Sequence, residues 1–238
     1  MSEYIKAIFK NRPNRFIGEC EINGEEVIVH IPNTGRCKEL LTPNATVYLL
    51  PSNNPKRKTK YSLNFVENKG HLVSLYSQDA NRIVYDGIIN GKIKELQGYE
   101  FHQREKTIGK SRIDIYLLNE KDDKKYLKKE ECFIEVKGVT LIKNGIATFP
   151  DAPTERGTKH LKELIKLKQE GSRTVVFFLI QHPLGDTFQP NWENDPKFST
   201  TLVKAYEEGV EILVYKSSNS LEKVEIMPKS LKFNLNKK

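Results

Sequence analysis

Short apolar runs separated by turn residues fill the first eighty positions of the chain. Residues 16–22 and 25–31 flank Asn23-Gly24, and this dipeptide between two such runs is the strongest short-range signal for a β-hairpin. The same pattern predicts further strands at 4–9, 46–50, 61–66 and 71–76, with a helical turn at 37–41. About five short strands with one helical piece favour a small β-barrel of the oligonucleotide-binding (OB) type, although an SH3-like barrel or an open meander would give a similar pattern.

The spacing of apolar residues becomes helical near residue 79. Residues 79–89 carry apolar side chains at 83, 84, 88 and 89, and Asn90-Gly91 ends this helix. The elements predicted after it are, in order, strands at 100–107, 112–118 and 132–137, a helix at 158–170, a buried strand at 172–181, a helix at 196–208 and a core strand at 210–215. The charged segment 119–131 is expected to be a solvated loop or the tip of a hairpin. This order indicates an α/β domain with a mixed sheet over residues 80–238, after a β-barrel domain over residues 1–79.

The composition of the chain bears on its cellular location and on whether it associates with a membrane. The longest apolar run, 175–180, is far shorter than the roughly 20 residues that span a membrane, and the first residues contain no apolar core of a signal peptide. Three widely spaced cysteines, Cys20, Cys37 and Cys132, do not form the pattern of a disulfide framework. We therefore expect a cytoplasmic protein with no membrane partner. Its oligomeric state is left open by the sequence.

The charge balance favours a polyanionic partner. The chain carries 39 Lys and Arg against 31 Asp and Glu, a formal net charge of +8. Such an excess most often serves nucleic-acid binding. It is divided between the predicted domains, with 11 basic and 8 acidic residues (+3) in 1–79 and 28 basic and 23 acidic residues (+5) in 80–238. Neither domain has a basic tail, so a surface for DNA must be made by folding.

Three side chains of the second domain form a pattern with chemical meaning. Asp114 lies on one predicted strand, and Glu135 and Lys137 share one face of the next because side chains alternate along a strand. Mg²⁺, or Mn²⁺ in its place, binds a small number of carboxylates, and the backbone carbonyl of Val136 could add a ligand. Asp…Glu-x-Lys on neighbouring strands is typical of PD-(D/E)xK nucleases, in which Lys137 would assist the attack of water on a phosphodiester. Grouped carboxylates also repel, which is expected to raise the pKa of at least one. A Glu–Lys salt bridge on a strand surface is the alternative.

Several short sequence blocks follow one another along nearly the whole chain. They are HIPNTG at 30–35, NPKRK at 54–58, Ala80-Asn81, SRID at 111–114, EVKGVTL at 135–141, FPDAPTERGTKHL at 149–161, Gln181-His182 and GVE at 209–211. Together these blocks resemble the sugar fermentation stimulation protein A family. The resemblance implies an N-terminal OB domain, a C-terminal nuclease-like domain, a DNA-binding role and a link to carbohydrate metabolism. It also implies a metal ligand from the first helix, where the family usually carries Glu and this chain carries Asp86.

Two groups of basic residues are the expected contacts with DNA phosphates. The first is a run in a loop between barrel strands: Lys56, Arg57, Lys58 and Lys60. Loops of OB folds bind single-stranded nucleic acid, with aromatic residues such as Tyr48 and Tyr61 stacking on bases. The second group stands at the start of a helix, whose free N–H groups also favour phosphate: Arg156, Lys159 and His160. A solvated loop and a salt-bridged helix cap are the respective alternatives.

The leading functional hypothesis is a DNA-binding protein with a nuclease site that depends on Mg²⁺ or Mn²⁺. The metal would be held by Asp86, Asp114, Glu135 and Val136, and the chemistry would be carried by Asp114, Glu135 and Lys137. The main alternative is a non-catalytic DNA-binding regulator linked to sugar metabolism, and a third is an enzyme or accessory protein acting on sugars. No Walker P-loop, GxSxG elbow or dinucleotide-binding fingerprint supports other chemistry.

Overall fold

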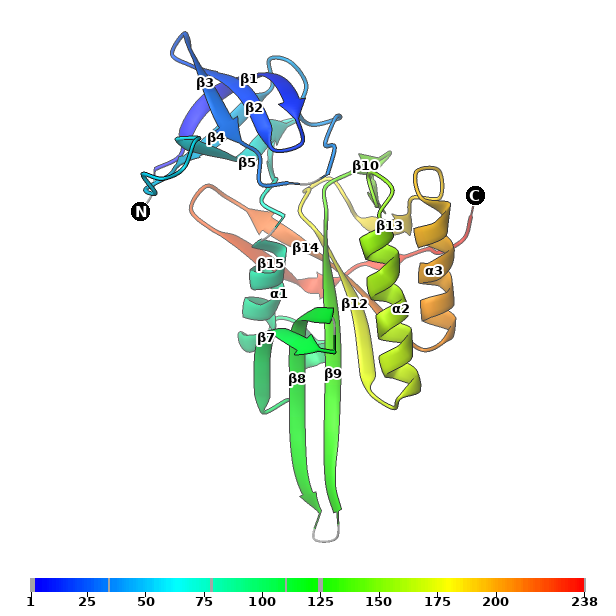
Figure 1. The fold of residues 1–238 in the computed structure, drawn as a ribbon. Coiled ribbons are helices and arrows are strands. Elements are labelled where there is room, and N and C mark those ends of the chain that lie inside the picture. The colour runs from blue at the N-terminus through cyan, green and yellow to red at the C-terminus, as the bar shows by residue number, and fades with distance from the viewer. Residues whose placement is uncertain (1–2, 34, 78, 110, 124–125, 238) are drawn as a thin grey trace.

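A computed structural model describes residues 3–33, 35–77, 79–109, 111–123 and 126–237 of the chain. The chain forms an N-terminal β-barrel and a larger α/β domain, which meet near the start of helix α1 (Asp79–Ile89) (Figure 1). In Figure 1 the barrel lies at the top of the α/β domain, and the two strands β8 and β9 extend away from it as a long arm.

The barrel is one sheet of six strands in the order β3-β2-β1-β4-β5-β6. The strands are β1 (Ile5–Asn14), β2 (Ile17–Ile22), β3 (Glu25–His30), β4 (Thr46–Pro51), β5 (Tyr61–Asn68) and β6 (His71–Ser74). A parallel pairing of β3 with β5 closes the barrel, so the open meander is excluded and the predicted OB-type barrel is confirmed. Asn23 and Gly24 both have positive φ, as the predicted two-residue turn between β2 and β3 requires. Inward-facing residues such as Val29, Val47 and Leu63 are fully buried.

The second domain is built on a mixed six-stranded sheet in the order β15-β14-β12-β9-β8-β7. Its strands are β7 (Phe101–Ile108), β8 (Ser111–Asp123), β9 (Tyr126–Val139), β12 (Arg173–Ile180), β14 (Glu211–Asn219) and β15 (Val224–Ser230). Strands β9, β12 and β14 run parallel to one another, and the other pairings are antiparallel. With α2 (Glu155–Gln169) and α3 (Pro196–Glu207), the observed order of elements confirms the predicted α/β domain.

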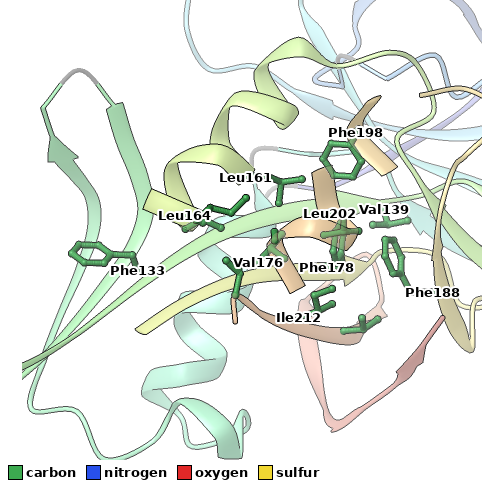
Figure 2. Close-up of a cluster of buried hydrophobic side chains, with 14 of the residues drawn as sticks. Phe133, Val139, Leu161, Leu164, Val176, Phe178, Phe188, Phe198, Leu202 and Ile212 are labelled. Carbon is green, nitrogen blue, oxygen red and sulfur yellow. The ribbon is translucent and has the colours of Figure 1, made fainter. Parts of the chain in front are cut away.

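Helices cover both faces of this sheet. Helix α1 and the short helix η1 (Lys94–Leu96) bury Ile83, Val84 and Leu96 against one face, to which Ile134 and Val136 of β9 contribute. Helices α2 and α3 cover the other face, where the core shown in Figure 2 includes Leu161, Leu164, Phe198 and Leu202. Because side chains alternate along β9, residues 133, 135 and 137 face the α2 side. None of the helices in the described ranges is long and apolar enough to cross a membrane.

Two parts of the domain differ from the sequence-based expectation. The charged segment 119–131 was expected to be a solvated loop or the tip of a hairpin, but the strands extend further into it than predicted, because β8 and β9 stay paired from Ile115–Ile134 to Asp123–Tyr126. A separate four-stranded sheet was not predicted, since strands of two to four residues are too short to show a period. It consists of β10 (Ile142–Lys143), β11 (Ile146–Phe149), β13 (Thr187–Pro190) and β16 (Lys232–Phe233).

Hydrogen bonds at two places fix the barrel to the α/β domain. At one, the Cys37 N–H donates to Asp151 Oδ2 at 3.2 Å, beside Gly35, where a Cβ would lie 2.6 Å from the same oxygen. At the other, the Ser74 N–H donates to the carbonyl of Gln181 at 3.3 Å, and the Gln181 side-chain amide donates to Ser74 Oγ at 3.3 Å. The barrel segment that contains Gly35 is therefore held close to Asp151, at the edge of the site described next.

Candidate active site

Asp114 lies where strands β8 and β9 separate. Their antiparallel ladder ends at the pair Ile115–Ile134, and Asp114 Oδ2 accepts the Val136 N–H at 2.8 Å just beyond it. The other carboxylate oxygen, Oδ1, accepts the side-chain amide of Asn81 in α1 at 2.7 Å. One carboxylate thus joins β8, β9 and α1 and keeps a fixed orientation.

The environment of Asp114 disfavours its charged form. Burial raises the pKa of this carboxyl to about 6, and the negative charge of Glu135 acts in the same direction. The positive charge of Lys137 and the two hydrogen bonds to Asp114 offset only part of the increase. This agrees with the expectation that grouping the carboxylates raises at least one pKa, although burial is the larger cause.

Glu135 points to the α2 side of the sheet and is 2% exposed. Its Oε1 contacts both Lys137 Nζ and His160 Nδ1, while its Oε2 is buried and has no hydrogen-bond partner among the described residues. Burial alone would raise the pKa of Glu135, but the charge of Lys137 and the hydrogen bond to His160 outweigh it and hold the pKa below its usual value. The two carboxylates of the site are therefore shifted in opposite directions.

His160 takes part in the carboxylate cluster as well as in the basic surface predicted for DNA. Arg156 Nε donates to His160 Nε2 at 3.3 Å, so Nε2 is the acceptor and Nδ1 carries the hydrogen that points to Glu135. Lys137 Nζ lies 3.4 Å from the same Nδ1. His160 is thus held on two sides and orients Glu135.

The other predicted phosphate contacts on α2 lie next to this cluster. Arg156 and Lys159 are exposed and, with His160, line an open pocket of about 540 Å³ that Arg112 of β8 also lines. Helix α2 begins beside them, with Thr154 Oγ1 accepting the Gly157 N–H as an N-cap at 3.0 Å. The structure thus brings Arg112 into a basic group that the sequence predicted from α2 alone.

A cleft of about 320 Å³ opens between the two domains on the other side of Lys137. Val136, Lys137 and Gly138 line it from β9, and Arg15 and Gly35 line it from the barrel. Thr148 Oγ1, which is buried and unpartnered among the described residues, belongs to the same lining. Lys137 therefore lies between Glu135 and a space that both domains share.

Two sequence-predicted groups are not joined to this cluster. Asp86 forms an ion pair with Arg82 at 2.7 Å, and the contact from α1 to the carboxylates comes from Asn81 instead. In the loop 56–60, the lysines are exposed and the Arg57 guanidinium donates within its own segment, to Thr59 and Ser62. No residue of this loop lines the cleft within the described chain. Metal binding by Asp86 and phosphate binding by the loop stay predictions.

Sequence reasoning missed Asn81 as a residue of the site. Its signal was the block Ala80-Asn81, which marks a polar residue beside the buried Ala80 in an amphipathic helix. The contact of His160 with Glu135 was also missed, because the sequence fixes only that a histidine lies near the start of α2.

Asp114 and Glu135 offer oxygen ligands of the kind that Mg²⁺ prefers. The buried, unpartnered Glu135 Oε2 is an acceptor that a cation would satisfy. Within the described ranges, no three His, Cys, Asp or Glu side chains form a group that could hold an ion by themselves. Mg²⁺ commonly binds through one or two carboxylates and fills its other positions with waters and substrate phosphates.

The fold and this site define a class of two-domain proteins, with an OB barrel followed by a mixed-sheet α/β domain that carries an acidic site with a lysine on its central strands. The family model described as the sugar fermentation stimulation protein RE domain matches residues 78–223, and the SfsA N-terminal OB domain model matches residues 11–75. The chain therefore belongs to the sugar fermentation stimulation protein family, as the sequence blocks indicated.

Relatives and a solved structure agree with this assignment. The chain is 67% identical to a sugar fermentation stimulation protein homolog of Methanobrevibacter smithii, over 99% of this chain and 100% of the relative. A homolog of Clostridium tetani is 47% identical over 88% of each chain. The structure of Pyrococcus furiosus SfsA in complex with Ca²⁺ matches with a TM-score of 0.84 and 30% identity, covering 98% of this chain and 97% of that one.

Proposed function

We propose that this protein binds DNA and hydrolyses its phosphodiester bonds with Mg²⁺ or Mn²⁺ held at Asp114 and Glu135. The observation that carries the proposal is that the charges of Glu135 and Lys137 both act on the part-buried Asp114 carboxyl where strands β8 and β9 separate, with Glu135 Oε2 buried and unpartnered among the described residues. The Pyrococcus furiosus relative was solved in complex with Ca²⁺, which prefers the same oxygen ligands. When bound, the metal would polarise the phosphate and lower the pKa of a water molecule.

Each side chain of the cluster has a distinct part in this proposal. Asn81 and the Val136 N–H hold Asp114 in place, and His160 orients Glu135. Lys137 lines the cleft, where its ammonium group would orient the attacking water or offset charge on the phosphate. Arg112, Arg156 and Lys159 would contact phosphates beside the scissile bond, because they line the pocket next to His160.

A cleavage assay tests this function. Plasmid DNA and labelled oligonucleotides are incubated with wild-type protein in MgCl₂, MnCl₂ or EDTA. We expect cleavage only with metal, and at least about a 100-fold loss in Glu135→Gln, since even outer-shell changes at metal sites cost about 10–100-fold. Glu193→Gln is the matched control, because Glu193 is exposed and forms a surface ion pair with Lys143. Equal cleavage by wild type and Glu135→Gln would mean that the activity does not come from this site.

One observation favours the second candidate, a non-catalytic DNA-binding regulator. Lys137 and His160 both contact Glu135 Oε1, so the charge of this carboxylate is already offset without a metal. In that case the wild type would bind DNA and cleave no substrate with either metal, and EDTA would leave both binding and the melting temperature unchanged.

A further inference from the structure

A second basic pocket lies on the barrel, outside the carboxylate site. It has a volume of about 350 Å³ and is formed by the end of β1 and the segment that follows β3. Its cationic lining residues are Lys10, Arg12, Arg15, Arg36 and Lys38, and no carboxylate lines it. Of these five, only Lys10 forms an ion pair within the described ranges, with Glu21 at 2.9 Å. The pocket therefore has a strong, largely uncompensated positive charge.

Arg12 fixes the shape of this pocket. Its guanidinium donates to the backbone carbonyls of Arg15 at 2.7 Å, Asn33 at 2.9 Å and Arg36. Its Nε is buried and has no partner among the described residues. Because the acceptors of this cation among the described residues are carbonyl groups, they do not neutralise its charge, and an anion nearby would be stabilised.

The lining also includes the apolar Phe9, Leu41 and Pro43, together with the polar but uncharged Asn11 and Asn14. An apolar floor with a cationic rim suits one nucleotide, whose base and sugar contact the floor while its phosphate meets the cations. Phe16, next to Arg15 in the turn after β1, is 50% exposed and offers a surface on which a neighbouring base can stack. Bases of a duplex are stacked inside the helix, so only an unpaired nucleotide can use such a pocket.

The pocket adjoins the cleft at Lys137, since the two spaces share lining residues. Arg15 and Gly35 line both spaces, and Lys137 lines the cleft on its other side. A DNA strand that leaves the carboxylate site along the cleft would therefore pass Arg15 and reach the barrel pocket. The acidic residue in the lining of the cleft is Asp151, whose Oδ2 already accepts the Cys37 N–H.

We propose that the barrel pocket binds a nucleotide of a single DNA strand that runs from the cleft past Arg15, so that the substrate is single-stranded DNA or a duplex with a single-stranded arm. The inference rests on the proposed function for the choice of DNA. Under this proposal the main DNA contact of the barrel is a pocket formed by two separate segments, and not the loop 56–60 that the sequence predicted.

Binding of fluorescein-labelled dT₁₂ in EDTA, followed by fluorescence anisotropy over a range of salt concentrations, tests this pocket. The variant is Arg15→Ala/Arg36→Ala/Lys38→Ala, and the matched control is Lys56→Ala/Lys58→Ala/Lys60→Ala; all six side chains are exposed and each triple removes three charges. With about 0.7 counterions released per phosphate contact on single strands, the pocket variant should lose about 2 in salt slope and bind roughly 10- to 100-fold more weakly. The control should change only about twofold, and a blunt 12-base-pair duplex should respond little to either change.

Several outcomes would overturn the proposal. These are no binding of dT₁₂ by the wild type, an equal loss in both triple variants, a loss in the control alone, or the same loss for the duplex as for the single strand. Melting temperatures verify that the variants fold, and the single substitution Arg36→Glu at an exposed position repeats the test if the triple variant does not. The cleavage assay tests the nuclease proposal separately. If the pocket variant selectively loses dT₁₂ binding and the wild type cleaves nothing, the pocket is supported and the nuclease is contradicted. If cleavage depends on Glu135 but the pocket variant binds dT₁₂ as the wild type does, the nuclease is supported and the pocket is contradicted.

Discussion

Replacing Asp114 with asparagine is expected to raise the melting temperature of the metal-free protein at pH 8, although Asp114 belongs to the candidate active site. Burial, followed by the negative charge of Glu135, raises the pKa of this carboxyl from 3.8 to about 6. At pH 8 the folded state therefore holds a charge that its environment disfavours. Such a shift corresponds to on the order of 2–3 kcal/mol, so the variant should melt roughly 5 °C higher.

The difference in melting temperature between the two proteins is expected to depend on pH. Asp114 is protonated in both the folded and the unfolded state below about pH 4, and between pH 4 and 6 the folded state binds more protons. The stability associated with Asp114 is therefore lost as pH rises through this window and stays constant above it. Wild type and Asp114→Asn should have similar melting temperatures at pH 4 and diverge up to pH 6. Thermal melts in EDTA from pH 4 to 8 measure this directly.

Hydrogen bonding at position 114 can be kept in the variant. The asparagine oxygen can accept the Val136 N–H, and its amide can donate to Asn81 once the Asn81 amide turns over. Asp186→Asn is the matched control, since Asp186 is a surface residue that pairs with Lys216, and it should not gain stability. Mn²⁺ should stabilise only the wild type and so reduce the difference. A lower melting temperature for Asp114→Asn at pH 8 would contradict the unfavourable ionisation of Asp114.

The two domains could be predicted because their elements are long enough to show a period. Five of the six barrel strands have six to ten residues, and helices α1 and α2 have eleven and fifteen. Strands β10 and β16 have two residues each, and their pairing depends on contacts with distant segments. The segment 119–131 was expected to be a solvated loop or the tip of a hairpin because its residues are charged, but charged residues can stay in a ladder when their backbone groups pair across it, as they do up to Asp123–Tyr126.

The site could be predicted only as far as strand geometry determines it. Alternation along β9 was enough to put Glu135 and Lys137 on one face. The rotation of α1 and α2 relative to the sheet is set by packing, so that Asn81 rather than Asp86 meets Asp114 and His160 meets Glu135. Repulsion between the carboxylates was expected to raise at least one pKa. The pKa of Asp114 is raised, whereas the pKa of Glu135 is lowered because Lys137 and His160 contact it.

The position of a basic binding surface is also only partly predictable from sequence. Four cations close together in sequence, in the loop 56–60, are easy to recognise. The barrel pocket draws its cations from two segments, residues 10–15 and 36–38, which a closed barrel and the Arg12 hydrogen bonds bring together. The pocket differs from the loop in more than charge, because its lining also includes apolar side chains and two residues that line the cleft.

Replacing Lys137 with methionine is expected to destabilise the protein strongly at neutral pH, the opposite of the effect at Asp114. Lys137 and Glu135 are 12% and 2% exposed, and removing one partner of a buried ion pair costs about 3–5 kcal/mol because the other charge remains buried. Since His160 still contacts Glu135, we expect a loss of about 3 kcal/mol in the free energy of unfolding, measured by urea denaturation at pH 7 in EDTA. Lys166→Met, which breaks an exposed ion pair between α2 and its C-cap residue Glu170, should have a much smaller effect.

The pH dependence and a double variant identify the cause of this loss. The pKa of Glu135 lies below its usual value of 4.5, so its ionised form stabilises the folded state above that pH, and this stability is lost as pH falls through the lowered pKa. Without Lys137, burial dominates and the pKa of Glu135 rises, so the destabilisation should be largest at pH 7 and shrink towards pH 4. Glu135→Gln in the Lys137→Met background removes the buried charge and should restore most of the lost stability, with a coupling between the two positions that a double-mutant cycle measures. If the double variant is no more stable than Lys137→Met, the lysine acts through packing alone, and Glu135 does not depend on it for its charge.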